Sequence, residues 1–280
     1  RMRIAIIGSG IAGNLAAYRL CREHDITVYE AAGHVGGHSH THTVVQGDRS
    51  HQVDTGFIVF NDWTYPGFVA LLEELGVASQ ASAMSFSVRN DATGMEYNGT
   101  TVNTLFAQRS NLVRPSFLAM VRDILRFNRH APQLLRQPAG EVPLGELLRS
   151  HRYSQSFIDN YIVPMGAAIW STSPGSMLAF PARFFVRLLM NHGMLTINDR
   201  PQWRTVAGGS ARYVAKLTAP FQERIRLRTP VEWIRRQPGG VILKAVGQES
   251  VRYDAVFLAC HSDQALQLLA DPTTAEREVL

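Results

Sequence analysis

The stretch Arg3-Ile4-Ala5-Ile6-Ile7-Gly8-Ser9-Gly10-Ile11-Ala12-Gly13 decides the fold of this chain. Its first five residues are typical of a buried β-strand, and an apolar helical pattern follows the glycines from Leu15 to Leu20. A second short strand is expected over Thr27–Tyr29, and Glu30 follows it, about twenty residues beyond the glycines. Strand, glycine spacing, helix and acid together predict a βαβ unit that binds a dinucleotide.

Each glycine of the motif has its own physical role. Gly8 makes the tight turn, Gly10 lets the backbone approach a pyrophosphate, and Gly13 lets helix and strand pack closely. The pyrophosphate is expected on the free N–H groups where the helix begins, at Ile11 and Ala12.

The residues after Glu30 depart from a nicotinamide-binding domain, which continues with a second crossover helix and a third parallel strand. Here a loop with a second glycine pair, Gly36-Gly37, comes instead. The segment Thr41–Phe60 then predicts two extended pieces around a turn at Gln46–Ser50. This departure favours FAD over NAD.

Several motifs in order resemble one superfamily. They are GSGIAG at 8–13, VYEAAGHVGGHSH at 28–40, VDTGFIVFN at 53–61, IWSTSP at 169–174, WRTVAGGSARYV at 203–214 and the segment Val231–Leu266. Together they resemble the flavin amine oxidase and phytoene desaturase superfamily. Within it, the sequence is most similar to bacterial proteins described as predicted NAD/FAD-binding oxidoreductases. The resemblance extends over nearly the whole chain.

The resemblance implies that FAD binds in an extended pose, and it assigns positions to that cofactor. The pyrophosphate would lie along Gly8, Gly10 and Gly13, and the adenosine ribose at Glu30. Gly36, Gly37 and His38 match a Gly-Gly-Arg segment near the pyrophosphate and ribityl chain; Gly56 and Phe57 match the stretch beside the flavin ring, and Val231 the residue whose backbone meets the adenine. The chain departs at His38, because a histidine lacks the fixed charge and the fork of a guanidinium.

The predicted fold class is α/β, with a Rossmann-like FAD-binding domain of the glutathione-reductase type and an inserted helix-rich substrate domain. We expect the first domain over residues 1–80 and 205–280, and the second over 81–204. A strand pair is expected within about 84–103, helices from Thr104 onward with a new start at Pro115, and strands again from Arg224 to Cys260. The individual expectations are helices Leu144–Ser150, Ser154–Ile162 and Ala182–Asn191, and strands Ile225–Arg228, Val231–Arg235, Val241–Val246 and Tyr253–Ala259.

Both ends of the chain carry expectations. Asp271-Pro272 is expected to cap a helix over Thr273–Leu280. The superfamily's last FAD motif, a Gly-Asp pair before a helix, is not among these residues, so we expect a further C-terminal portion. The sequence begins with Arg1 ahead of a methionine, so we expect Met2 to be the natural first residue.

Composition is that of a soluble enzyme: 280 residues, of which 45% are apolar, with no apolar run long enough to span a membrane. Cys21 and Cys260 have no CxxC spacing, so buried reduced thiols and cytoplasmic residence are expected. The net charge of +5 comes from arginine. These arginines could favour an anionic substrate or a membrane surface, or they are scattered surface charges. They are not interleaved with aromatic residues, so no nucleic-acid binding is predicted.

Four groups of residues invite a role at the substrate site or elsewhere. Aromatic residues follow Gly56 and could wall a substrate cavity or form core; within them Asn61 and Trp63 are the substrate candidates. Trp170 and Arg204 match segments that, in the superfamily this sequence resembles, bring the substrate domain back to the flavin. Arg204 would be either an anchor for an anionic group or a surface ion-pair residue. His34, His38, His40, His42 and His51 crowd one segment, yet no cysteine or paired carboxylate completes a metal site, so no metal is predicted. The helix at Phe180–Leu189 is expected in the core, or resting on a membrane.

The predicted function is an FAD-dependent oxidoreductase that moves a hydride from a substrate C–H bond to flavin N5. The substrate is a small molecule, either an amine, an unsaturated lipid or a polyene. Two alternatives stay open: a flavin-dependent isomerase or mutase with no net redox change, and a nucleotide-binding module without catalysis.

Overall fold

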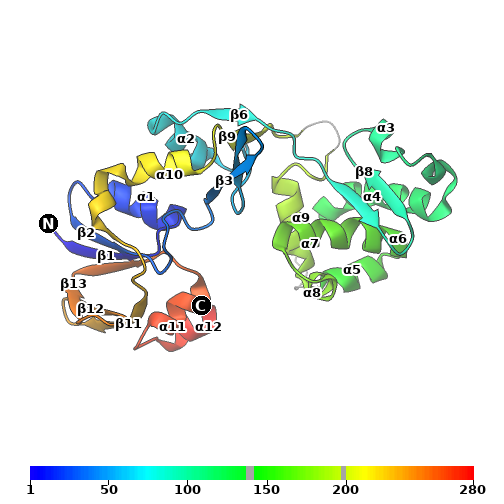
Figure 1. The fold of residues 1–280 in the computed structure, drawn as a ribbon. Coiled ribbons are helices and arrows are strands. Elements are labelled where there is room, and N and C mark those ends of the chain that lie inside the picture. The colour runs from blue at the N-terminus through cyan, green and yellow to red at the C-terminus, as the bar shows by residue number, and fades with distance from the viewer. Residues whose placement is uncertain (137–141, 197–199) are drawn as a thin grey trace. The chain divides into compact units, whose positions relative to one another are not determined.

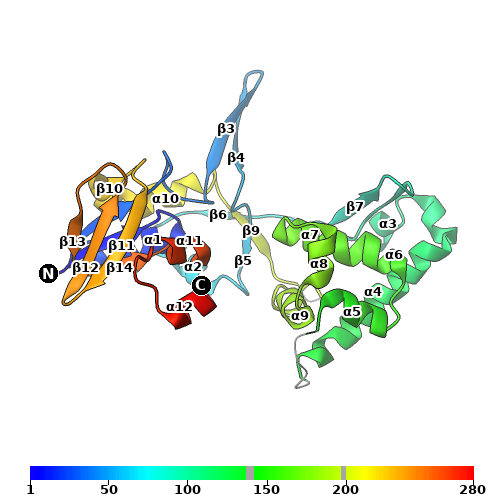
Figure 2. The ribbon, with the colours of Figure 1, turned by 90° about the horizontal axis from the view of Figure 1, so that it is seen from below.

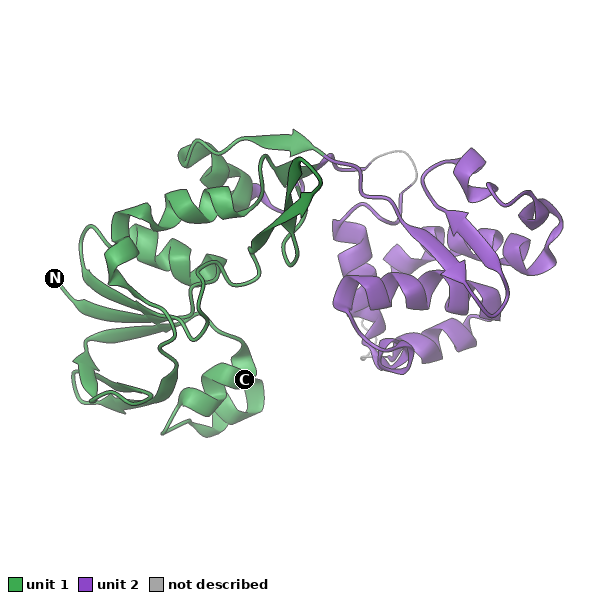
Figure 3. Ribbon diagram, viewed as in Figure 1, with its two compact units in different colours: residues 1–60, 67–81, 204–280 green, residues 61–66, 82–203 purple. Residues whose placement is uncertain are grey.

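The computed structural model describes residues 1–136, 142–196 and 200–280, and its ribbon is drawn in Figure 1. The chain forms two compact units (Figure 3). The first contains residues 1–60, 67–81 and 204–280, and the second contains residues 61–66 and 82–203. We expected the divisions at 80/81 and 204/205; residues 61–66 group with the second unit.

A parallel sheet of four strands, ordered β10-β2-β1-β14, is the frame of the first unit. Its strands are β1 (Arg3–Ile7), β2 (Asp25–Tyr29), β10 (Ile225–Arg226) and β14 (Ala255–Leu258). Helix α1 (Ile11–Leu20) connects β1 to β2 as the crossover of a βαβ unit. The predicted start of the fold is present.

Alternate residues of β1 bury against different layers. Ile4 and Ile6 pack with Ala17 of α1 and Phe221, whereas Ala5 and Ile7 pack with Ile234, Leu243 and Tyr253 of a three-stranded antiparallel sheet. That second sheet consists of β11 (Val231–Gln237), β12 (Gly240–Ala245) and β13 (Val251–Tyr253). Figure 1 shows α1 and α10 (Ala211–Thr218) on one side of the parallel sheet and β11–β13 on the other. Both faces are covered, which explains why β1 reads as a continuous apolar run.

The expected strand Tyr253–Ala259 is wrong, because the structure divides it at Asp254. The Asp254 N–H donates to the Arg3 carbonyl at 2.8 Å, and the Arg3 N–H donates to the Asp254 carboxylate at 2.7 Å. These bonds turn the chain, so that β13 pairs with β12 and β14 pairs with β1. The partner of Asp254 lies at the other end of the chain, and the local apolar pattern carries no sign of it.

A hairpin of β3 (Thr41–Gln46) and β4 (Arg49–Asp54) occupies the segment where two extended pieces were predicted. Its turn contains Gly47 at φ +60°, a conformation that favours glycine. Nearly all of its residues are exposed, and Figure 2 shows it projecting from the first unit. The remaining elements that lie wholly or partly in this unit are α2 (Pro66–Glu74), a sheet ordered β5-β9-β6 from Phe60–Asn61, Trp203–Val206 and Ser79–Ala81, η3 (Ala219–Arg224), α11 (Ser262–Leu268) and α12 (Thr274–Val279).

The second unit is built mainly of short helices around one core. The helices are α3 (Val102–Leu105), η1 (Arg109–Val113), α4 (Pro115–Leu134), α5 (Leu144–Ser150), α6 (Gln155–Phe157), η2 (Ile158–Ile162), α7 (Val163–Trp170), α8 (Pro174–Ala179) and α9 (Ala182–Asn191), beside the strand pair β7 (Ser87–Asn90) and β8 (Met95–Asn98). Phe117, Phe127, Phe157 and Phe185 are fully buried in it. Helices α5 and α9 have the predicted bounds, and α4 begins at Pro115, where its fixed φ suits a first helical turn.

Two local expectations fail in this part of the chain and near its end. The helix predicted over Ser154–Ile162 continues through η2 into α7, ending only at Trp170. Helix α12 is capped by Thr273 rather than by Asp271-Pro272, because Thr273 and Glu276 form a reciprocal capping box. Asp271 instead faces Arg236, with 3.4 Å between its Oδ2 and the arginine Nε.

Of the two cysteines, Cys21 is buried but Cys260 is partly exposed.

We predict that the hydroxyl pair between the two sheets of the first unit behaves as a coupled unit. The hydroxyls of Tyr29 and Tyr253 are 2.7 Å apart and buried. Tyr253→Phe leaves the Tyr29 hydroxyl without that partner and should lower the free energy of unfolding by about 1–2 kcal/mol. The double change Tyr29→Phe/Tyr253→Phe should cost less than the sum of the single changes, measured by urea unfolding. Strict additivity would contradict the pairing.

Candidate functional site

The turn after β1 is packed so tightly that two of its glycines serve the chain itself. Gly8 has φ +99°, and a Cβ there would lie 2.6 Å from the Ala259 carbonyl oxygen. A Cβ on Gly13 would lie 1.9 Å from the Gly8 carbonyl oxygen. Any side chain at either position would collide with backbone, so the two glycines hold α1 against the end of β1.

Gly10 differs from both, because a Cβ there would meet nothing within 4 Å. It precedes α1 and offers no side chain to cap the helix. The first bond of this helix runs from the Asn14 N–H to the Gly10 carbonyl, so the N–H groups of Ile11 and Ala12 precede it. Ile11 and Ala12 are exposed. Open space beside free donors at a helix N-terminus suits an anion such as a pyrophosphate.

The second glycine pair lies against this turn. The Gly36 N–H donates to the Ser9 carbonyl at 2.9 Å, and a Cβ on Gly37 would lie 3.0 Å from the Gly10 Cα. Both glycines have positive φ, +115° and +58°. The structure thus brings together two glycine loops that are separated by a helix and a strand in sequence. His38 next to them is exposed, and its ring stacks on that of His261 with centroids 6.0 Å apart.

Glu30 is held at the same place by backbone and side-chain donors. Its carboxylate accepts bonds from the Ser9 N–H at 2.9 Å, the Ser9 hydroxyl at 2.5 Å and the Ala32 N–H at 2.8 Å. Burial by itself raises the pKa of Glu30, but these hydrogen bonds outweigh it, and the pKa lies below its ordinary value. The ionised carboxylate has about four acceptor positions, so it can also accept from a ribose hydroxyl.

The remaining predicted cofactor positions reach this region through backbone contacts. A Cβ on Gly56 would lie 2.3 Å from the His38 carbonyl oxygen, and the Phe57 N–H donates to that oxygen at 3.0 Å. Val231 begins β11, two residues after Thr229, whose N–H donates to the Glu30 carbonyl at 2.9 Å. The residues predicted for the cofactor therefore come from four segments, 8–13, 30–38, 56–57 and the start of β11, which hydrogen bonds join directly or through a neighbouring residue.

Sequence reasoning missed Asp54, which ties the segment before Gly56 to a further segment at Ser210. Its carboxylate accepts from the Thr41 hydroxyl at 2.5 Å, the Ser210 hydroxyl at 2.7 Å and the Ser210 N–H at 3.0 Å. The hairpin base is thereby fastened to the start of α10. A buried contact between the hydroxyls of Ser39 and Tyr213 reinforces it. The only available signal was an acid just before Thr55-Gly56, which alone does not reveal a partner 156 residues away.

The aromatic group after Gly56 divides between the two units. Phe57 and Phe60 pack edge-on against Phe68 in the first unit. Trp63, which is 46% exposed, lies beside Gly193 in the second unit, where a Cβ would be 3.1 Å from the indole. The group is therefore shared between the two units.

Asn61 is fully buried and shapes the turn that follows it. Its Oδ1 accepts bonds from the Trp63 N–H, the Thr64 N–H and the Thr64 hydroxyl at 2.9–3.0 Å. Its Nδ2 has no hydrogen-bond partner among the described residues. Half of this amide is thus structural, and the other half is a buried donor without a partner among the described residues.

The other two substrate candidates are engaged within their own units. Trp170 packs its ring near those of Phe180, Phe184 and Phe185 at the end of α7. Arg204 donates from Nε to the Ser79 hydroxyl at 2.9 Å and from Nη2 to the Ser79 carbonyl at 3.1 Å, across the β6–β9 pair. Both acceptors belong to Ser79 and are uncharged.

The crowded histidines stack rather than gather around a point. The rings of His34 and His40 have centroids 4.0 Å apart, and those of His40 and His42 lie 4.1 Å apart. Burial and the two neighbouring imidazoles lower the pKa of His40. Within the described ranges, no three His, Cys, Asp or Glu side chains are placed to hold a metal ion.

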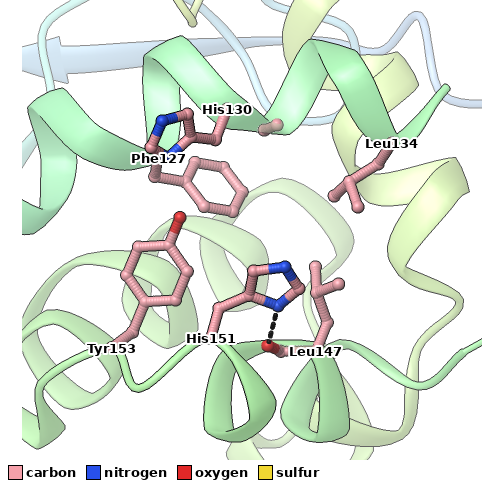
Figure 4. A pocket seen from close by; sticks show the side chains of 7 residues that line it. Phe127, His130, Leu134, Leu147, His151 and Tyr153 are labelled. Atoms are coloured by element: carbon pink, nitrogen blue, oxygen red, sulfur yellow. Dashed lines mark hydrogen bonds between the residues drawn. The ribbon is translucent and has the colours of Figure 1, made fainter. Parts of the chain in front are cut away.

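A small pocket lies wholly within the second unit (Figure 4). It is lined by Phe127, His130, Ala131, Leu134, Leu147, His151 and Tyr153. The His151 Nδ1 lies 3.0 Å from the Leu147 carbonyl, as the dashed line shows. None of the residues predicted for cofactor or substrate lines it.

The family of flavin-containing amine oxidoreductases matches this sequence over residues 11–279. The chain belongs to this family. FAD is the cofactor that goes with the family, and the open cradle at Gly10 fits its pyrophosphate. A comparison with curated proteins gives no significant match.

Solved structures share the fold of this flavin-family chain. Cyclohexylamine oxidase from Brevibacterium oxydans IH-35A is 19% identical, with a TM-score of 0.75 over 99% of this chain and 62% of that one. Putrescine oxidase bound to putrescine is 20% identical, with a TM-score of 0.72 over 99% and 62%. A fatty acid isomerase from P. acnes is 18% identical, with a TM-score of 0.67 over 99% and 63%. The chain thus spans less than two thirds of the length of these proteins.

No helix within the described residues has the length and apolar character needed to cross a membrane.

We predict that Gly10→Val abolishes FAD binding and leaves the fold intact. The added side chain would enter open space instead of backbone, and would occupy the place of the pyrophosphate. Calorimetric titration with FAD measures the binding, and thermal unfolding checks the fold. Gly175→Val is the matched control, since a Cβ there also meets nothing within 4 Å. Undiminished FAD binding by the Gly10 variant would show that the cradle is elsewhere.

We also predict a pH-dependent role for Glu30 in the stability of the glycine turn. Glu30→Gln loses at least one acceptor for Ser9 or Ala32, and should cost about 1–2 kcal/mol of unfolding free energy at neutral pH. Because the folded-state pKa is lowered, the contribution exists above the ordinary pKa and disappears as pH falls through the folded value. The difference between wild type and variant should therefore shrink below about pH 4. The exposed Glu23→Gln change should have little effect at any pH; a Glu30 difference independent of pH would oppose this account.

Proposed function

We propose that this chain binds FAD at the carboxyl end of its parallel sheet and serves an enzyme that oxidises a substrate C–H bond. The observation that carries the proposal is Gly10, whose missing side chain leaves space that the folded chain itself does not use. Gly8 and Gly13, by contrast, have backbone atoms of the chain itself in that place, and Gly10 has no positive φ that would require a glycine. Family membership supplies the identity of the ligand.

The residues around the cradle have distinct proposed tasks. The N–H groups of Ile11 and Ala12 would donate to the pyrophosphate, and Gly37 would let the second loop approach it. Glu30, held ionised by Ser9 and Ala32, would accept from the adenosine ribose. His38 would donate a single hydrogen bond where an arginine would offer a charged fork. When bound, FAD supplies the hydride acceptor, N5 of its flavin.

The substrate side of the proposal rests on the second unit and on the segment that follows Phe60. The unit is helical with its own core, and we assign it to the substrate. The unpaired Nδ2 of Asn61 would donate to a polar group of the substrate, and Trp63, with nearly half of its surface exposed, would offer an apolar contact. Trp170 and Arg204 are proposed as further contacts, with Arg204 anchoring an anionic group. The fold neighbours bear the names of amine oxidases and of a fatty acid isomerase, so amines and unsaturated lipids or polyenes are the classes to test first.

The direct test is a visible spectrum of the purified protein with FAD, before and after anaerobic incubation with candidate substrates. Loss of the flavin absorption with an amine or a lipid is the expected result. Calorimetry should show tighter binding of FAD than of NAD. Tighter binding of NAD would overturn the cofactor assignment.

Two other outcomes separate the remaining functions. Turnover by reduced protein without net electron transfer would assign the chain to a flavin-dependent isomerase. A flavin that no electron donor reduces would assign it to a nucleotide-binding module without catalysis. Asn61→Asp provides an internal check, because Oδ1 keeps its acceptor role while the free donor is lost. We expect that variant to bind FAD normally and to turn over substrate more slowly.

A further inference from the structure

Helix α4 of the second unit exposes a stripe in which leucine and arginine alternate. Leu118, Arg122, Leu125 and Arg129 follow one another at intervals of four, three and four residues, which places them on one helix face. Leu118 is 44% exposed and Leu125 is 50% exposed. The opposite face is buried in the core through Phe117, Met120 and Phe127. The stripe is therefore not the side by which this helix packs.

Further exposed apolar residues lie just before the helix. Leu112 and Val113 of η1 are 51% and 82% exposed, and they are flanked by Arg109 and Arg114. We call the α4 stripe together with Leu112 and Val113 the arginine–leucine surface. Such an apolar content on a solvent-exposed helix calls for a partner.

All exposed charged side chains of residues 102–136 are positive. Residues 102–136 contain six arginines and a single acidic residue, Asp123. Asp123 is fully buried, where it accepts a bond from the Ser154 N–H at 2.7 Å and lies 3.4 Å from Arg122 Nη2 and 3.7 Å from Arg126 Nε. No acidic side chain in this stretch reaches the surface, so the net charge of the whole chain is concentrated here.

The alternation of charge and apolar groups identifies the kind of partner. A protein interface has an apolar centre and a charged rim, whereas here Arg122 lies between two leucines. A nucleic acid offers phosphates but no apolar layer for leucine. An anionic lipid surface offers phosphates and an apolar layer at adjacent depths. Leucine can enter the acyl boundary, while arginine extends its apolar stem and binds phosphate.

We propose that the arginine–leucine surface docks this protein onto an anionic membrane surface without spanning it. The sequence predicted a core helix at Phe180–Leu189, with a membrane contact as the alternative. In the structure α9 buries Phe185, Val186 and Leu189, and its Arg183 donates to the carbonyls of Leu134 and Leu135 at 3.0 and 3.2 Å. Helix α9 thus packs on α4 through this face, while Phe184 and Met190 on its other side stay exposed; α4 differs in that its exposed face carries both leucines and arginines over nearly its whole length. This proposal does not depend on FAD binding.

Vesicle sedimentation of the intact 280-residue chain tests the charge component. Vesicles of phosphatidylserine with phosphatidylcholine should bind the protein, and vesicles of phosphatidylcholine alone should not. Arg122→Gln/Arg129→Gln should weaken binding by about tenfold or more. The matched control, Arg49→Gln/Arg277→Gln, removes the same charge from exposed positions of the first unit and should leave binding nearly unchanged.

A second pair of variants tests the apolar component. Leu118→Ser/Leu125→Ser should also weaken binding by about tenfold, since each leucine loses its apolar contact with the acyl boundary. Val44→Ser/Val45→Ser is the control, because these valines are exposed on the hairpin of the first unit. As a positive signal, Leu125→Trp should give tryptophan emission that shifts to the blue with anionic vesicles only.

Four results would overturn the proposal. The first is equal binding to both kinds of vesicle, and the second is an equal loss of vesicle binding in the arginine variant and in its control. The third is tight binding of soluble polyglutamate that the leucine changes do not affect, and the fourth is dimerisation without vesicles that the leucine changes abolish. The third would assign the surface to an acidic protein, and the fourth to a second copy of the chain.

Discussion

The contact between α1 and the turn after β1 is the constraint on which the rest of the first unit depends. The two backbones approach so closely that a Cβ on Gly13 would lie 1.9 Å from the Gly8 carbonyl oxygen. That approach fixes the N-terminus of α1 at the carboxyl end of the sheet and presents Ser9 to two partners. The Ser9 carbonyl then receives the Gly36 N–H, and its N–H and hydroxyl bind Glu30. Three segments of the chain meet because one helix is held close to one strand.

Within this arrangement the glycine motif separates into two kinds of position. Gly8 and Gly13 are required by the chain, since any Cβ would collide with backbone. Gly10 is required by nothing in the folded chain. The fold does not require a glycine at this position, and the N–H groups at the start of α1 lie beside it. This combination indicates that the open space at Gly10 accommodates a ligand. The same comparison gives the family assignment a physical basis in this chain's own residues.

The sequence predicted the features that arise from neighbouring residues and missed those that depend on distant ones. Strand β1 and helices α5 and α9 have the predicted bounds, because apolar periodicity and proline positions act locally. The break at Asp254 depends on Arg3, the anchoring role of Asp54 depends on Ser210, and the displaced cap at Thr273 accompanies an ion pair of Asp271 with Arg236. A local pattern cannot show which acid will find a distant donor, since only the tertiary fold brings the two together.

The central claim is that the N-terminus of α1 holds the pyrophosphate of FAD, and amide NMR of the isotopically labelled chain tests it most directly. Addition of FAD should shift the amide resonances of Ile11, Ala12 and Gly37, because these N–H groups border the open space at Gly10. AMP, which lacks a pyrophosphate, should shift them less and should perturb the residues beside Glu30 instead. Shifts by FAD that leave Ile11, Ala12 and Gly37 unchanged would contradict the account.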